Sequence, residues 1–448
     1  MLFRSGFAAA LAGEADASAA CARLNLQDYA EAVLSNAALH RDTFDRRRTK
    51  TGRPLGAFDC IQAPCTDECP INQKVPEYMK LVREGRWAEA AALTREDNPL
   101  PSILGRACNH LCENVCVRTH YDEPLAIREI KRAIMDHETR AGLKPVPVSR
   151  RERIAVIGAG PCGLSTAYFL TLAGYAVELF EARPYAGGMV SGTIPGYRAA
   201  MDKVRYDMDL VVSLGAVVHY NCRAGRDVTL AQLRARGFAA VVVAAGAQRG
   251  GRLDVEGEDA EGVYDALDFL RMSREEHPPK LGREVAVIGG GDVAMDCART
   301  ARRLGADRVR IVYRRTLAEM PASRDELREL LEEELPIVEL TAPKRLVVGN
   351  GRVKAIQCVR MQLGEPDASG RRRPVEVPGS DFEMPVDQVV VAVNQQADLS
   401  FFGDERPAVN RSGFIEVDRA MKTSLPDVYA GGDIGPQGPA SIVRSEER

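Results

Sequence analysis

The sequence predicts a multidomain α/β protein in which a helical N-terminal region precedes two parallel, doubly wound domains. Three observations lead to this prediction. A short apolar strand, a glycine turn, a helix and a second apolar strand follow one another over residues 154–180. The same order returns over residues 285–313, and a proline-marked segment, residues 144–148 (KPVPV), precedes the first unit. Strands that alternate with helices in this way form parallel sheets covered by helices.

The expected domain order follows from these units. We expect a helical domain over residues 1–148, with helices at 75–84 and 86–95 among others. A first dinucleotide-binding domain is expected from residues 149–275 and 386–448, and a second from residues 276–385. Three domains agree with a chain of 448 residues.

Composition and charge exclude several classes of protein. Sixty basic residues against 63 acidic ones leave a net charge of -3, which argues against a nucleic-acid binder. No apolar run reaches the roughly 18–20 residues of a membrane span. The 11 cysteines belong to a long chain, whereas disulfide frameworks belong to small secreted domains. We therefore expect a cytoplasmic protein.

The first nucleotide-binding motif is formed by residues 158–163 (GAGPCG), between the strand at 154–157 and a helix at 161–173. Glycines at these positions permit a tight turn and close approach to a pyrophosphate, and the helix N-terminus attracts the phosphates. Glu181 ends the next strand, 23 residues after Gly158, where a carboxylate can bind ribose hydroxyls. The motif and the acid together predict a dinucleotide site.

Two further segments indicate that this dinucleotide is FAD. Residues 186–189 (AGGM) place a glycine pair shortly after Glu181, and residues 428–433 (VYAGGD) run from a strand into a glycine turn and Asp433. That carboxylate can hydrogen-bond the ribityl chain of a flavin; either segment alone would more often be an ordinary turn. The candidate FAD-binding residues are Gly158, Gly160, Pro161, Gly163, Glu181, Ala182, Gly188, Met189, Gly432 and Asp433.

The second motif, residues 289–294 (GGGDVA), also follows a strand and opens a helix. Its second strand ends in Tyr313, Arg314 and Arg315 instead of an acid. Arginine at this place favours the 2′-phosphate of NADPH, whereas a carboxylate favours NADH. If Arg314 and Arg315 are instead surface residues at the start of a helix, NAD remains an alternative to NADPH. The candidate NADPH-binding residues are Gly289, Gly291, Asp292, Val293, Ala294, Arg314 and Arg315.

Six of the cysteines lie within 57 residues of one another: Cys60, Cys65, Cys69, Cys108, Cys112 and Cys116. Closely spaced thiolates with a Cys-Pro pair are typical of iron–sulfur sites, whereas zinc sites favour the Cys-x2-Cys pairs that are missing here. Zinc or unmetallated thiols are the alternatives. Two 4Fe–4S clusters have four ligands each, so either two ligands are not cysteine or only one cluster is complete.

The order of these motifs over about residues 54–440 resembles the small subunit of NADPH-dependent glutamate synthase and its relatives. These include the N-terminal half of dihydropyrimidine dehydrogenase and putative selenate reductase flavoproteins. Further segments contribute to the resemblance: residues 98–101 (NPLP), 105–108 (GRAC), 121–124 (YDEP), 194–198 (IPGYR) and 319–322 (EMPA). Arg198, in the fourth of these, is a further candidate cofactor-binding residue.

The resemblance implies an electron-input module. NADPH would reduce FAD, and 4Fe–4S clusters would carry single electrons to or from a larger catalytic partner subunit. It also implies that Cys60, Cys65 and Cys116 serve one cluster, and that Cys69, Cys108 and Cys112 serve the other. No acid–base pair is needed, because the cofactors supply the chemistry.

Three departures from the family pattern stand out. Ala57 replaces a further cysteine, and the non-cysteine ligand of relatives falls on Lys131, so that Asp59 or a water would have to substitute. Only residues 441–448 follow where relatives continue into a long helix beside the flavin, so we expect a shortened chain with a weakened flavin site. The alternatives to the electron-input module are therefore a stand-alone NAD(P)H:acceptor reductase and an inactive scaffold.

Overall fold

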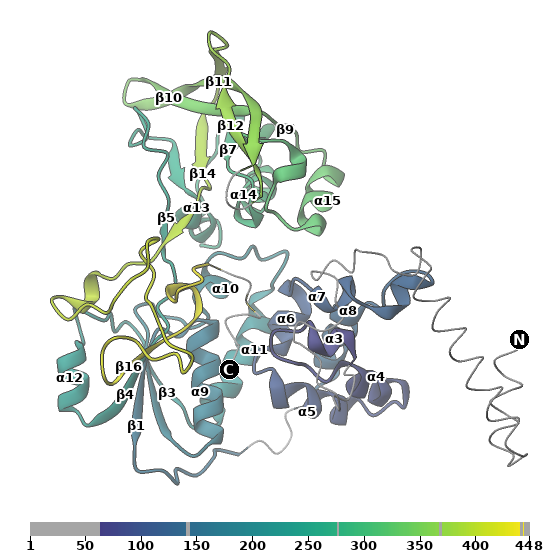
Figure 1. Ribbon diagram of the computed structural model, residues 1–448, viewed down its shortest axis with the longest axis vertical. Coiled ribbons are helices and arrows are strands. Elements are labelled where there is room, and N and C mark those ends of the chain that lie inside the picture. Colours follow the sequence, from purple (N-terminus) through teal and green to yellow (C-terminus); the bar gives the residue numbers. More distant parts are fainter. Residues whose placement is uncertain (1–62, 140–143, 276, 367–369, 440–441, 443–448) are drawn as a thin grey trace, which may run out of the picture.

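A computed structural model describes residues 63–139, 144–275, 277–366, 370–439 and 442 of the chain. Figure 1 shows a helical domain beside a first parallel-sheet domain, with a second sheet domain above them. The expectations that concern Ala57, Asp59 and Cys60 lie outside the described residues.

Short helices build the N-terminal domain. Proline occupies the first turn of α3, α4 and α6, where its missing N–H costs nothing. Ile127, Ile134 and Met135 form the apolar face of α8 and pack with Val75 and Tyr78. The elements are α3 (Pro64–Asp67), α4 (Val75–Arg83), α5 (Trp87–Asp97), α6 (Pro101–Ala107), α7 (Leu111–Asn114), η2 (Val117–His120) and α8 (Ile127–Asp136).

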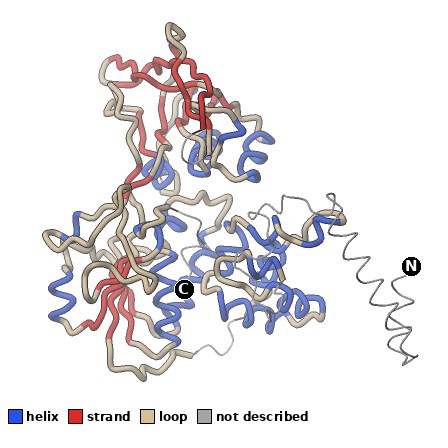
Figure 2. The backbone as a smooth tube through the Cα atoms, in the orientation of Figure 1, coloured by secondary structure: helices blue, strands red, loops and turns tan. Residues whose placement is uncertain are grey.

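The first sheet domain is a five-stranded parallel sheet in the order β16-β4-β1-β2-β3. Its strands are short and apolar because helices cover both faces of such a sheet (Figure 2). The elements are β1 (Arg153–Ile157), α9 (Pro161–Leu172), β2 (Ala176–Phe180), α10 (Gly188–Gly192), α11 (Met201–Ser213), β3 (Val217–His219), α12 (Leu230–Ala235), β4 (Phe238–Val243), η4 (Ser400–Phe402), β16 (Val428–Ala430) and η5 (Gly432–Ile434).

The second sheet domain is also five-stranded and parallel, in the order β6-β14-β7-β8-β9. Two antiparallel strands, β5 (Arg249–Gly250) and β15 (Gln395–Gln396), connect it to the first. Its elements are β6 (Val263–Asp265), α13 (Ala266–Met272), β7 (Glu284–Ile288), α14 (Asp292–Arg303), β8 (Arg308–Val312), η3 (Leu317–Glu319), α15 (Arg324–Glu332), β9 (Ile337–Val338) and β14 (Gln388–Val391).

The domain boundaries differ from those expected from the sequence at 275/276 and 385/386. Strand β14 pairs with both β6 and β7, so β6, the helix α13 that follows it and β14 belong to the second sheet domain and not to the first. The physical reason is long-range pairing: Val389 lies beside Val263 in the sheet although the two are far apart in the sequence.

An antiparallel sheet extends from the second domain, at the top of Figure 1. It consists of β10 (Thr341–Gly349), β11 (Arg352–Pro366), β12 (Arg372–Glu376) and β13 (Phe382–Pro385). Strands β11 and β12 form a hairpin, and its turn end lies against the segment after β8, because the Nε of Arg315 donates to the carbonyl oxygen of Arg372, the first residue of β12, at 2.7 Å.

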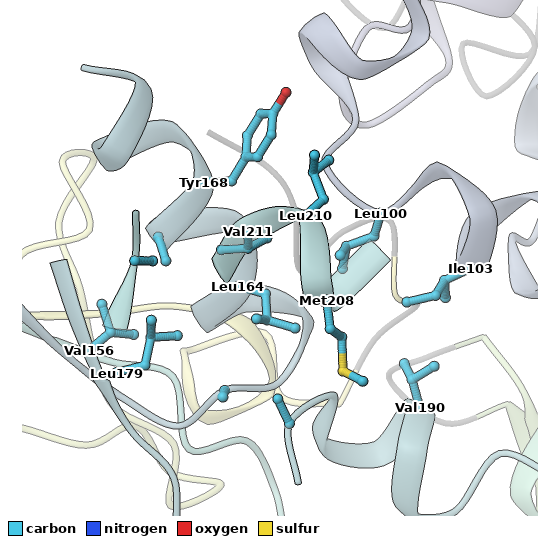
Figure 3. Close-up of a cluster of buried hydrophobic side chains, with 14 of the residues drawn as sticks. Leu100, Ile103, Val156, Leu164, Tyr168, Leu179, Val190, Met208, Leu210 and Val211 are labelled. Carbon is cyan, nitrogen blue, oxygen red and sulfur yellow. The ribbon is translucent and has the colours of Figure 1, made fainter. Parts of the chain in front are cut away.

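The helical domain and the first sheet domain share one core. Leu100 and Ile103 lie with Leu164 and Met208 in the cluster that Figure 3 shows. The carboxylate of Asp207, fully buried on α11, accepts from the backbone N–H of Ile103 at 2.9 Å and from Arg95 at 3.1 Å. A buried carboxylate is stable only when it is paired in this way. Helices α5 and α6, the second of which ends just before Cys108, are therefore fixed against the first sheet domain.

Candidate cofactor sites

The first glycine motif forms a cradle with backbone on every side. At Gly158, where φ is +98°, an added Cβ would lie 2.6 Å from the carbonyl oxygen of Ala244. At Gly163 it would lie 2.0 Å from the carbonyl oxygen of Gly158. The second glycine turn lies against the first, since a Cβ on Gly188 would come within 2.9 Å of the Gly160 Cα. These contacts explain why the turn admits only glycine.

Glu181 lies at the end of β2 and closes this cradle. Its Oε2 accepts from the backbone N–H of Ala159 at 2.9 Å, and its Oε1 accepts from that of Arg183 at the same distance. The side chain lines the cavity, and each carboxylate oxygen has a second lone pair for a ribose hydroxyl. The position is the one that the sequence predicts for a ribose ligand.

Arg183 is a residue of this site that the sequence reasoning missed. Its Nη2 donates to the Oε1 of Gln248 at 2.8 Å, and both residues line the cavity. Its Nη1 is buried and has no hydrogen-bond partner in the part of the chain that the structure describes. A buried guanidinium donor without an acceptor fits an anionic group such as the FAD pyrophosphate. The sequence did contain a signal for this role, because Arg183 is a basic residue two positions after Glu181.

The second motif forms a similar cradle at the start of α14. A Cβ on Gly289 would lie 2.2 Å from the carbonyl oxygen of Ala392, and one on Gly290 would lie 2.5 Å from the ring of Tyr313. The third position tolerates Ala294, which is fully buried in the second core. Asp292 accepts from the backbone N–H of Ser323 at 2.7 Å through its Oδ1.

The two arginines after β8 have different surroundings. Arg314 is exposed at the cavity and makes no hydrogen bond or ion pair with another described residue. Arg315 is buried, and its Nε is used by the carbonyl oxygen of Arg372. Arg314 is therefore the better placed of the two to bind a phosphate.

One continuous cavity of about 1200 Å³ joins these features. It is lined by all the candidate cofactor-binding residues except Gly163, Ala294 and Gly432, which lie behind the turns. The cavity also reaches Ala107 and Asn109, on either side of Cys108. The two nucleotide motifs and the cysteine region thus face one space.

Arg198 spans the two sheet domains. Its Nη1 contacts the Oδ2 of Asp296 on α14, and its Nη2 contacts the Oε1 of Glu326 on α15, each at 2.7 Å. The neighbouring ring of Tyr197 lies under the guanidinium of Arg303, 4.1 Å from its centroid. Arg198 lines the cavity, as expected of a cofactor-binding residue, and it also holds the domains together.

We expect Glu326 to make the stability of this contact depend on pH. Burial raises the pKa of Glu326 to about 7, against the opposing effect of Arg198. Because the folded pKa lies above the unfolded value, the stabilising contribution is complete below the unfolded pKa and disappears as the pH rises through 7. Between about pH 5 and about pH 8 the free energy of unfolding should fall by roughly 1–3 kcal/mol more in the wild type than in Glu326→Gln.

Urea unfolding over this pH range measures that difference. Glu332→Gln is the control, because Glu332 lies on the same helix but its side chain is 68% exposed. The control should follow the wild type. If the free energy of unfolding changes equally with pH in the wild type and in Glu326→Gln, the expectation is wrong.

The five described cysteines of the helical domain fall into two groups. Cys69, Cys108 and Cys112 interact electrostatically, and so do Cys65 and Cys116. All five are free thiols. The fully buried Tyr78 packs in the same apolar cluster as Cys65 and Cys112, so the two groups are neighbours. This grouping matches the one that the family resemblance implies, with Cys60 outside the described residues.

These thiols suit a cluster better than a single ion. Over the described ranges, no three His, Cys, Asp or Glu side chains converge as the ligands of one metal ion would. In a 4Fe–4S cluster each thiolate binds a different iron, so its ligands stand farther apart. Burial raises the pKa of Cys69 and that of Cys112, so iron must displace protons there.

Lys131 lies beside Cys69 and Cys112. Burial dominates the raised pKa of each thiol, and the lysine charge acts against that rise. The side chain is 7% exposed and pairs with no carboxylate of the described residues. We call Cys69, Cys108 and Cys112 the three-cysteine group. The structure thus places the buried Lys131 next to this group, at the position where the resemblance implies a fourth ligand.

Two family models match the chain, one over the sheet domains and one over the helical domain. Residues 152–447 match the pyridine nucleotide-disulphide oxidoreductase family, and residues 50–143 match dihydropyrimidine dehydrogenase domain II, a 4Fe-4S cluster domain. None of the helices in the described ranges has the length and apolar character that a membrane-spanning helix needs.

Curated relatives include the small chain of the NADPH glutamate synthase of Escherichia coli, 34% identical over 84% of this chain and 84% of its own length. The beta subunit of the NADP(+)-dependent formate dehydrogenase of Moorella thermoacetica is 44% identical over 84% of this chain. The beta subunit of the NADPH-Fe(3+) oxidoreductase of Geobacter sulfurreducens is 38% identical over 85%. The match spans 57% and 61% of the last two relatives.

Among solved structures, FprA of Mycobacterium tuberculosis in complex with NADPH has a TM-score of 0.59 and 22% identity. The match covers 66% of this chain and 83% of FprA. This likeness supports the two-domain α/β fold.

Proposed function

Because this chain belongs to the pyridine nucleotide-disulphide oxidoreductase family, in the glutamate synthase small-chain group with a 4Fe-4S domain, we propose that it is an electron-input subunit. It is an FAD-dependent NAD(P)H oxidoreductase with FAD, NADPH and 4Fe-4S as cofactors. The proposal adds the route: electrons pass from NADPH through FAD to the clusters, and then to a larger catalytic subunit.

The observation that carries the proposal is the shared cavity. It extends from Gly289–Gly291 past the first glycine motif to Ala107 and Asn109. Cys108 lies between these last two residues and packs with Cys69 against Leu104. A flavin in the first cradle would therefore lie between the nicotinamide site and the three-cysteine group.

The residues of the first cradle would hold and orient FAD. The N-terminus of α9 and the buried Nη1 of Arg183 offer donors to its pyrophosphate, and Glu181 offers acceptors to its ribose. When bound, FAD accepts a hydride and releases electrons singly. The chain contributes position and electrostatics to that chemistry.

The three-cysteine group is the cluster site nearer the cavity, and the group of Cys65 and Cys116 is the outer one. Ile442 lines the cavity and packs against the same buried pair, Ile71 and Leu104, as Cys69 and Cys108, which supports placing this group beside the flavin site. The names of the relatives support a partner, because those proteins are a small chain and two beta subunits of larger enzymes.

The test of this function begins with the purified full chain under anaerobic conditions. About one FAD with about eight iron and eight sulfide per chain would support two 4Fe–4S clusters. Flavin without iron would support a stand-alone reductase in place of an electron-input subunit. Neither cofactor would support an inactive scaffold.

We expect Arg314→Ala to raise the KM for NADPH by roughly tenfold or more, because a hydrogen-bonded ion pair to the 2′-phosphate is lost. The KM for NADH should stay within about twofold, since NADH has no 2′-phosphate. Steady-state reduction of a small dye by the holoenzyme measures both constants. An equal effect on the two nucleotides would refute the role of Arg314.

A further inference from the structure

We propose that Arg371, which directly precedes β12 at the turn end of the β11–β12 hairpin, is a second cation of the 2′-phosphate site and helps to select NADPH. This inference rests on the proposed role of Arg314 and extends it to another segment of the chain. The antiparallel sheet would then contribute directly to nucleotide specificity.

The start of β10 is fixed against the end of β8 by backbone hydrogen bonds, and β11 of the hairpin pairs with β10. The N–H of Thr341 donates to the carbonyl oxygen of Tyr313 at 3.0 Å, and the N–H of Leu340 donates to that of Arg315 at 3.1 Å. The N–H of Met361, on β11, donates in turn to the carbonyl oxygen of Leu340 at 2.8 Å.

A side-chain contact completes this attachment on the other strand of the hairpin. Arg315 is buried, and its Nε donates to the carbonyl oxygen of Arg372 at 2.7 Å. The residue next to Arg372 is therefore held close to the segment that bears Arg314. Both Arg314 and Arg371 line the cavity, together with residues 341–343.

Of the three consecutive arginines at positions 371–373, only Arg371 lines the cavity. Arg371 is half-buried and lines the cavity. Arg372 donates through its Nη2 to the carbonyl oxygen of Leu363 at 3.0 Å, so its side chain serves the hairpin itself. Arg373 is exposed and does not line the cavity.

The charge of the ligand explains the need for a second cation. A phosphate monoester carries close to two negative charges near neutral pH and offers three acceptor oxygens. One guanidinium can satisfy two of those oxygens in a bidentate contact. Arg314 and Arg371, which line the same cavity, together match the charge and the number of acceptors.

The experiment compares Arg371→Ala with Arg373→Ala in the holoenzyme. Arg371→Ala should raise the KM for NADPH by roughly tenfold and weaken the binding of 2′,5′-ADP to a similar extent, measured by calorimetry. The KM for NADH and the affinity for 5′-AMP should be unchanged. Arg373→Ala should behave like the wild type in all four measurements.

Two outcomes would overturn the inference. One is an Arg371→Ala variant with wild-type affinity for 2′,5′-ADP; the other is an equal loss for NADPH and NADH, which indicates a structural role. Arg314→Ala separates this failure from that of the proposed function. If Arg314→Ala is selective for NADPH and Arg371→Ala is not, only the present inference fails. If neither variant is selective, the 2′-phosphate site itself is wrong.

Discussion

Replacing Cys108 with alanine is expected to remove about half of the iron from the chain and leave FAD in place. Cys108 lies with Cys69 and Cys112 in the group nearer the cavity, and a cluster that loses one of three thiolates is not retained. NADPH-dependent reduction of small dyes should persist, because the flavin cradle is built by other residues. Reduction of the outer cluster by NADPH should be lost.

Iron, sulfide and flavin quantitation per chain measures this outcome. Cys358→Ala is the control, since Cys358 is a free, buried cysteine on β11, in the second sheet domain. It should keep the wild-type iron content. An unchanged iron content in Cys108→Ala would show that Cys108 is not a cluster ligand. A loss of FAD together with the iron would mean that the helical domain and the first sheet domain, which share a core, have unfolded.

Gly163→Ala should have a similarly large effect on the flavin. The added Cβ would lie 2.0 Å from the carbonyl oxygen of Gly158, a backbone atom that cannot move without opening the turn. Overpacking of this kind costs roughly 1–3 kcal/mol. Because the cost falls on the phosphate-binding turn, FAD occupancy should drop by roughly tenfold or more.

The flavin-to-protein ratio and the thermal midpoint measure this effect. Gly196→Ala is the matched control, because nothing lies within 4 Å of the Cβ that it would add. It should retain FAD. Stoichiometric FAD in Gly163→Ala would show that the cradle is less tightly packed than the geometry indicates.

The local units could be predicted from the sequence because each is encoded in adjacent residues. The strands at 154–157 and 285–288 lie within β1 and β7, and the two glycine motifs open α9 and α14 as expected. Periodicity and turn chemistry are sufficient for such units.

Features that depend on distant residues could not be found in this way. The pairing of β14 with β6 moves a domain boundary, and no local pattern indicates it. The contact of Arg198 with Asp296 joins residues from different domains. Arg314 and Arg315 are equivalent in the sequence, and only the fold buries one and exposes the other.

Electrons from NADPH are expected to reach the three-cysteine group through the flavin site. This route can be followed by anaerobic titration of the wild-type holoenzyme with NADPH and electron paramagnetic resonance. We expect flavin bleaching to be accompanied by the signal of a reduced iron–sulfur cluster, and Cys108→Ala to lose this signal. Flavin bleaching with no cluster signal, in a sample whose clusters dithionite reduces, would show that electrons do not take this route.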